Sequence, residues 1–75
     1  MVTIVRAANW KIAVYGREHG VPHFHIEGPG FRASISIETN DLIIGSVPPS
    51  VLRDARSWAA GHRTELNNIW SKLNP

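Results

Sequence analysis

Residues 22–38 read PHFHIEGPGFRASISIE, two runs on either side of a Gly-Pro-Gly turn. Every second residue of 31–38 is apolar, which is the pattern of a strand with one buried face. The run before the turn begins with Pro22, and the first position of a strand tolerates proline. Because Gly-Pro-Gly is a strong turn signal, the stretch predicts a β-hairpin that pairs residues 22–27 with 31–38.

Three more strands are predicted outside this hairpin. Residues 2–7 and 10–15 are rich in β-branched and aromatic residues, and the intervening residues 8–9 predict a tight turn. A polar turn after the central hairpin leads into a short run at residues 42–45. Every connection is too short for a parallel crossover, so the sequence predicts an antiparallel meander of about five strands.

Residues 47–75 predict one long helix. Prolines stand at its start, where a missing backbone N–H costs nothing. At about 100° per residue, the apolar side chains fall on one stripe and the charged ones lie outside it. That stripe contains Val51, Ala55, Ala59, Leu66, Ile69 and Leu73. Gly61 lies on the solvent side and permits a bend at a cost of about 1 kcal/mol, so the helix is predicted from about Pro49 to Leu73.

The predicted fold class is α+β, a single domain over residues 1–75 with the sheet in 1–46 and the helix in 47–75. One helix covers one face of a small sheet and leaves the other solvated. The face toward the helix is predicted to carry Trp10, Ile12, Val14, Phe24, Ile26, Phe31, Ala33, Ile35 and Ile37. The uncovered face is predicted to carry Lys11, Tyr15, His23, His25, Glu27, Arg32, Ser34, Ser36 and Glu38.

Composition excludes several classes of protein. With 43% hydrophobic and 19% charged residues and a net charge of +2, the chain does not belong to the disordered class. The absence of cysteine excludes disulfides, thiol catalysis and cysteine-ligated metals. No apolar run is long enough for a membrane span, and the N-terminus is not that of a secretory signal, so the protein is predicted to be cytoplasmic. The cations are scattered along the chain, so charge alone is a weak indication of nucleic-acid binding.

Three of the four histidines lie within seven positions, at His19, His23 and His25. At positions i and i+2 of a strand, His23 and His25 point the same way with side chains roughly 6.5–7 Å apart. This spacing suits two ligands of one metal ion, with His19 or Glu18 as a third. It also suits a proton-transfer pair, because histidine titrates near neutrality. A third interpretation is that these are ordinary surface histidines.

The fourth histidine, His62, falls in the middle of the apolar stripe of the predicted helix. A histidine at such a position is usually a buried, hydrogen-bonded core residue, and we predict that role for His62. Trp58 and Trp70 share the stripe and are predicted to be core residues too.

Five stretches of the chain carry a family resemblance: EH at 18–19, PHFHI at 22–26, RASISI at 32–37, GSVP at 45–48 and the helix pattern WA…HRTEL…W at 58–70. In this order they resemble the bacterial family called domain of unknown function 4160. The family usually has a second proline where this chain has Val21. The resemblance implies a small cytoplasmic protein encoded beside a second small protein, in an arrangement like a toxin–antitoxin pair.

The leading hypothesis from the resemblance and the residues is a toxin-like protein that acts on or binds RNA through the uncovered face. A metal-free ribonuclease needs a base, an acid and a cation for the phosphorane charge. His23 and His25 are the candidate acid–base pair, Arg32 the candidate phosphate clamp, and Tyr15 or Lys11 an auxiliary group.

Two other classes of function stay open at this stage. One is a non-catalytic module whose uncovered face docks the small cognate protein encoded nearby. The other is an accessory protein that binds a divalent metal through His19, His23 and His25. No other cofactor is expected. The sequence does not decide whether the chain is an enzyme, nor its oligomeric state.

Overall fold

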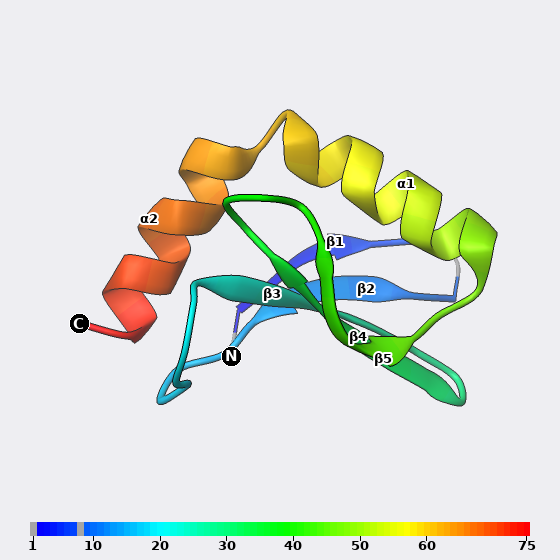
Figure 1. Ribbon diagram of the computed structural model, residues 1–75, viewed down its shortest axis with the longest axis horizontal. Helices are drawn as coiled ribbons and strands as arrows, with labels where there is room; N and C mark the ends of the chain where they lie inside the picture. Colours follow the sequence, from blue (N-terminus) through cyan, green and yellow to red (C-terminus); the bar gives the residue numbers. More distant parts are fainter. Residues whose placement is uncertain (1, 8) are drawn as a thin grey trace.

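The computed structural model describes residues 2–7 and 9–75, which form a five-stranded antiparallel sheet and two helices (Figure 1). In chain order the elements are β1 (Val2–Arg6), β2 (Lys11–Val14), β3 (His23–Gly28), β4 (Phe31–Ser36), β5 (Leu42–Ser46), α1 (Pro49–Ala60) and α2 (Arg63–Leu73). The strands lie side by side in sequence order, and each neighbouring pair is antiparallel. The α+β class and the five-stranded meander are therefore confirmed.

The strands of the hairpins pair so that the side chains predicted to share a face do so. In the central hairpin His25 lies opposite Ser34, and Gly28 opposite Phe31 at the turn. In the first hairpin the N–H of Ala7 donates a 2.8 Å hydrogen bond to the carbonyl of Trp10. The predicted turn at residues 8–9 includes Ala8, which lies outside the described residues.

The helices pack on the face of the sheet predicted to be covered (Figure 1). The core consists of sheet residues Ile12, Val14, Phe24, Ile26, Ile35 and Ile37 with helix residues Val51, Ala55, Ala59, Leu66 and Trp70. Ala33 is buried as well, and Trp10 and Phe31 pack half-buried against the core. The period-two pattern thus assigned the apolar face correctly.

The prediction of one long helix was wrong, because the chain interrupts its helix at Gly61 and His62. The N–H of Gly61 bonds to the carbonyl of Trp58 and that of His62 to the carbonyl of Ala59, so α1 closes with two tight i→i−3 bonds. A straight helix over residues 49–73 would be about 37 Å long, longer than the 32 Å extent of the molecule. The break instead turns α2 down over the end of the sheet (Figure 1).

The break also changes the place of His62. Its ring stacks on Trp58, with centroids 4.0 Å apart and an interplanar angle of 7°. Its Nδ1–H donates a 2.7 Å hydrogen bond to the carbonyl of Trp58. The predicted hydrogen bond is present, but His62 is half-buried and not a core residue, since the interruption moves it off the apolar stripe. Trp70 is buried as predicted, whereas Trp58 is half-buried against the core.

At one edge of the sheet β5 is exposed along its whole length. Its pairing with β4 shifts between Ser34, opposite Ile44, and Ile35, opposite Leu42. Ile43 is therefore the extra residue of a β-bulge. Of the residues described, 2–7 and 9–75, neither helix combines the length and apolarity that a membrane crossing requires.

Candidate metal centre

The face of the sheet that was predicted to be uncovered carries His23 and His25. Contrary to the prediction, this face is not open to solvent. The rings of His23 and His25 lie 5.1 Å apart, so the prediction that they share a face is correct. Their exposed fractions are nevertheless only 9% and 6%. The ring of Trp70 from α2 lies 4.8 Å from His23, and the ring of Tyr15 lies edge-on to His25 at 4.8 Å. The expectation of solvent-exposed histidines was wrong because the end of α2 and the β2–β3 loop cover them.

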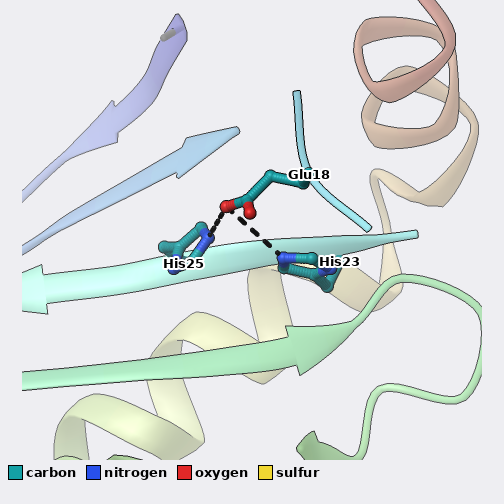
Figure 2. A group of neighbouring side chains, drawn as sticks. All are labelled: Glu18, His23 and His25. Carbon is teal, nitrogen blue, oxygen red and sulfur yellow. Dashed lines mark hydrogen bonds and ion pairs between the residues drawn. The ribbon is translucent and has the colours of Figure 1, made fainter. Parts of the chain in front are cut away.

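A carboxylate from that loop points at both imidazole rings (Figure 2). Oε1 of Glu18 lies 3.0 Å from Nε2 of His25 and 3.7 Å from Nε2 of His23. One ligand atom from each of these three residues lies within 4.8 Å of the others. His19, the other loop residue considered as a third ligand, is exposed and is not part of this group. We call Glu18, His23 and His25 the triad.

The backbone sets the tautomer of His23. Its Nδ1 lies 2.8 Å from the carbonyl oxygen of Val21, which only accepts hydrogen bonds, so Nδ1 carries the proton. In the neutral ring the lone pair is then on Nε2, the nitrogen that faces Glu18. Metal-binding histidines are commonly oriented by a backbone carbonyl at the opposite ring nitrogen, and His23 has that arrangement.

His25 is held from both sides of its ring. Its Nε2 lies 3.0 Å from the Glu18 carboxylate, so Nε2–H donates a hydrogen bond when no metal is bound. Its Nδ1 lies 3.4 Å from Oγ of Ser34 and 3.4 Å from Nη2 of Arg32. A metal ion on Nε2 would displace that proton to Nδ1, and the Ser34 hydroxyl can accept the hydrogen bond from Nδ1–H.

The surroundings hold two members of the triad in the protonation states that a metal ion requires. Burial lowers the pKa of His25 below 6.5, although its hydrogen bond to Glu18 acts in the opposite direction. The hydrogen bond from His25 lowers the pKa of Glu18 below 4.5. At neutral pH, His25 is therefore a neutral imidazole and Glu18 an anion, the forms that bind a divalent metal.

The same two shifts predict acid sensitivity of the metal-free protein. Both folded-state pKa values are lower than the unfolded ones, so the unfolded chain binds more protons and the free energy of unfolding rises with pH. The contribution of His25 is present above its ordinary pKa of 6.5 and that of Glu18 above 4.5, and each is lost as the pH falls further. Urea unfolding from pH 8 to pH 4 should show stability falling below neutrality. His25→Gln should flatten the upper part of that profile, and identical profiles would contradict the prediction.

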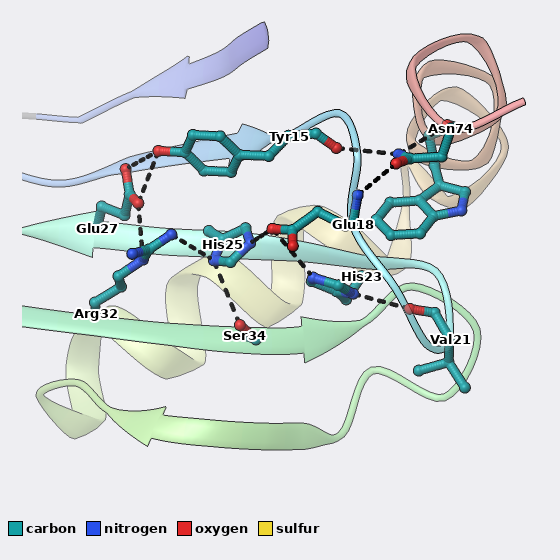
Figure 3. A network of polar contacts seen from close by, with 10 residues as sticks. Tyr15, Glu18, Val21, His23, His25, Glu27, Arg32, Ser34 and Asn74 are labelled. Atoms are coloured by element: carbon teal, nitrogen blue, oxygen red, sulfur yellow. Dashed lines mark hydrogen bonds and ion pairs between the residues drawn. The ribbon is translucent and has the colours of Figure 1, made fainter. Parts of the chain in front are cut away.

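Beside the triad, the carboxylate of Glu27 contacts three predicted site residues, of which Figure 3 shows Tyr15 and Arg32. The hydroxyl of Tyr15 donates to both oxygens of Glu27, at 2.7 and 2.8 Å. Nε of Arg32 lies 3.0 Å from Oε2 of Glu27, and Nζ of Lys11 lies 3.7 Å from Oε1. Burial first, and then the hydrogen bond to Glu27, raise the pKa of Tyr15. The predicted phosphate clamp and both auxiliary groups are thus bound to a residue to which the sequence had assigned no role.

Asn74 was also missed, and it anchors the loop that carries Glu18 (Figure 3). Its Oδ1 accepts a 2.9 Å hydrogen bond from the backbone N–H of Glu18. Its Nδ2 donates to the carbonyls of Tyr15, at 3.0 Å, and Trp70, at 3.2 Å. The residue that follows α2 therefore ties the triad loop to the C-terminal end of the fold.

The triad opens into a groove between the β2–β3 loop and β5. Two adjoining cavities, of about 360 and 320 Å³, both include Glu18, His25, Ser34 and Ile44 in their walls. Cavities of this size accommodate small-molecule ligands. A ligand in this groove would lie directly against the triad.

Residues 9–71 match the family model described as "Domain of unknown function (DUF4160)". The chain belongs to this family. No curated protein and no solved structure shows significant similarity to it. The matched region includes the whole triad and Trp70 but ends before Asn74. The family description assigns no activity.

Proposed function

We propose that this protein binds one divalent transition-metal ion through Glu18, His23 and His25 and presents the open coordination positions of that ion to the groove. The convergence of one carboxylate and two imidazoles within 4.8 Å carries the proposal. Structural zinc sites usually have four protein ligands, whereas catalytic sites have three and keep a position for water or substrate. Three protein ligands beside a groove therefore favour a centre that binds or transforms a ligand.

Two of the three ligand-atom distances agree with a shared ion, and the imidazole nitrogens of His23 and His25, within 4.8 Å of each other, would draw together around it. Zinc lies about 2.0–2.2 Å from nitrogen and oxygen ligands, which places two tetrahedral ligands about 3.4 Å apart. The Glu18–His25 and Glu18–His23 distances of 3.0 and 3.7 Å lie on either side of that value. Burial of both rings and the carbonyl of Val21 supply the dry, oriented surroundings that such centres need.

The RNA-directed acid–base hypothesis has weaker support from the same residues. Arg32 is already paired with Glu27, and His25 is bonded to Glu18. Proteins that bind single-stranded nucleic acid combine a basic groove with aromatic stacking surfaces, whereas Val21, Ile43 and Ile44 line this groove. The toxin-like role and the cognate partner protein stay predictions from the family resemblance.

The direct test is a metal titration of the purified, metal-free protein. Calorimetry with Zn²⁺ should saturate at one equivalent, and the melting temperature should rise with metal concentration because the ion binds the folded state. Bound Co²⁺ should give visible absorption of a four- or five-coordinate ion. His19→Ala is the matched control, since His19 lies outside the triad, and it should bind metal like the wild type. Absence of stoichiometric binding, or its loss in His19→Ala, would reject the proposed centre.

Asn74 offers a test of how the centre is positioned. Asn74→Ala removes the bond to the Glu18 backbone and frees the loop, so we expect the affinity for Zn²⁺ to fall about 10–100-fold, as for other outer-shell partners. Zn²⁺ titration measures the change, and urea unfolding reports any loss of stability separately. Asn68→Ala, at an exposed position of α2, should leave both unchanged. Equal affinities in the two variants would show that the loop holds Glu18 without Asn74.

A further inference from the structure

We infer that the groove beside the triad binds an amphiphilic ligand, with a singly charged anionic head on the metal ion and an aliphatic body along β5. This inference rests on the proposed metal centre. It concerns a different set of residues, the apolar walls of the groove, whose contribution can be measured separately.

The walls are the most exposed large apolar side chains described. Val21, Ile43 and Ile44 are 58%, 49% and 71% exposed. All three line the cavity that also contains His23 and His25. Contiguous exposed apolar side chains are uncommon on soluble proteins and mark ligand grooves or interfaces. Their position directly beside a buried polar triad favours a ligand that has both a polar and an apolar part.

The bulge in β5 explains how two successive isoleucines line one cavity. Neighbouring side chains of a regular strand point to opposite faces, but a bulge places two residues opposite one and redirects them. Gly45 follows the bulge with a φ of +98°, and a Cβ there would lie 2.3 Å from the carbonyl oxygen of Arg32. The backbone beside the isoleucines is thus one that only glycine accommodates.

The charges around the triad set the charge of the head group. A divalent ion bound by one carboxylate, Glu18, and two neutral imidazoles leaves one net positive charge. Arg32, the cation that lines the groove, is paired with Glu27, and Lys11, the second cation on that carboxylate, lines neither cavity. A monoanionic oxygen ligand, such as a carboxylate or hydroxamate, neutralises the remaining positive charge. A multiply charged phosphate would leave a net negative charge in the groove.

Two hydroxamates provide the test, because they share a metal-binding head and differ in chain length. The Zn²⁺-loaded protein should bind octanohydroxamate at least tenfold more tightly than acetohydroxamate, since each buried methylene contributes about fourfold. Ile43→Thr/Ile44→Thr keeps the β-branched shape and should reduce that preference to less than threefold. Binding of Zn²⁺ and of acetohydroxamate should not change in this variant. Leu42→Thr is the matched control, an exposed residue of β5 outside both cavities.

The outcomes separate this inference from the metal centre. Normal Zn²⁺ and acetohydroxamate binding without a chain-length preference would overturn the amphiphilic ligand and leave the centre intact. Absence of Zn²⁺ binding would overturn both. Sedimentation adds one further outcome: a dimer that the double threonine variant dissociates would make the isoleucines a subunit interface and the inference wrong.

Discussion

Glu18→Gln should reduce the affinity for Zn²⁺ by about 100-fold or more. Loss of an outer-shell partner typically costs 10–100-fold, and Glu18 is a proposed direct ligand that supplies the only negative charge of the triad. The amide keeps the size of the side chain and can still accept the hydrogen bond from His25. The fold should therefore survive the substitution, and the loss should lie in metal binding itself.

Competition with a chromophoric chelator measures this affinity over the required range. Glu38→Gln is the matched control, because Glu38 is an exposed carboxylate on the segment that follows β4. It removes the same charge from the chain and should leave the affinity unchanged. Equal affinities of wild type and Glu18→Gln would mean that the carboxylate is not a ligand.

Trp70→Ala should cause the largest loss of stability, about 3–5 kcal/mol, as expected for truncation of a large buried aromatic residue. The free energy of unfolding of a 75-residue domain is about 4–11 kcal/mol in total, so this variant should be near the limit of folding. Trp70 is 8% exposed and contributes to the core while its ring contacts His23. Its loss should weaken both the packing and the triad.

Urea unfolding followed by circular dichroism gives the stability change. Trp70→Phe retains a ring against His23 and should recover most of the loss. Trp58→Ala, at a half-buried position on α1, should cost clearly less than Trp70→Ala. A small effect of Trp70→Ala, comparable to that of Trp58→Ala, would contradict the assignment of Trp70 to the core.

The strands were predictable because their signals are local. Alternation between 31 and 38 and the turn at 28–30 specify which side chains share a face, and the register places His25 opposite Ser34 as that alternation requires. The helix break was not predictable, because the apolar side chains before and after it fall on the same stripe when one continuous helix is assumed. One glycine, Gly61, carries too weak a propensity to decide between a bend and two helices.

The site was only partly predictable, for a different reason. The pairing of His23 and His25 follows from strand geometry, but the choice between Glu18 and His19 depends on how an irregular loop is held. That loop is held by Asn74, which lies 56 positions from Glu18 in the chain. A local sequence pattern does not indicate a contact between residues so far apart in the chain. The burial of the histidines was not predictable for the same reason, because it depends on the packing of the end of α2 and of this loop.

The direction that α2 takes after the break links the triad to local opening of the backbone. Helix ends are among the segments whose amide hydrogens exchange with solvent earliest. Here the end of α2 contributes Trp70 against His23 and is followed by Asn74 on Glu18, so fraying of this turn disassembles the site while the sheet stays intact. If an ion on the triad disfavours that fraying, then by thermodynamic reciprocity a partner that binds only the unfrayed end of α2 must raise the affinity for the ion.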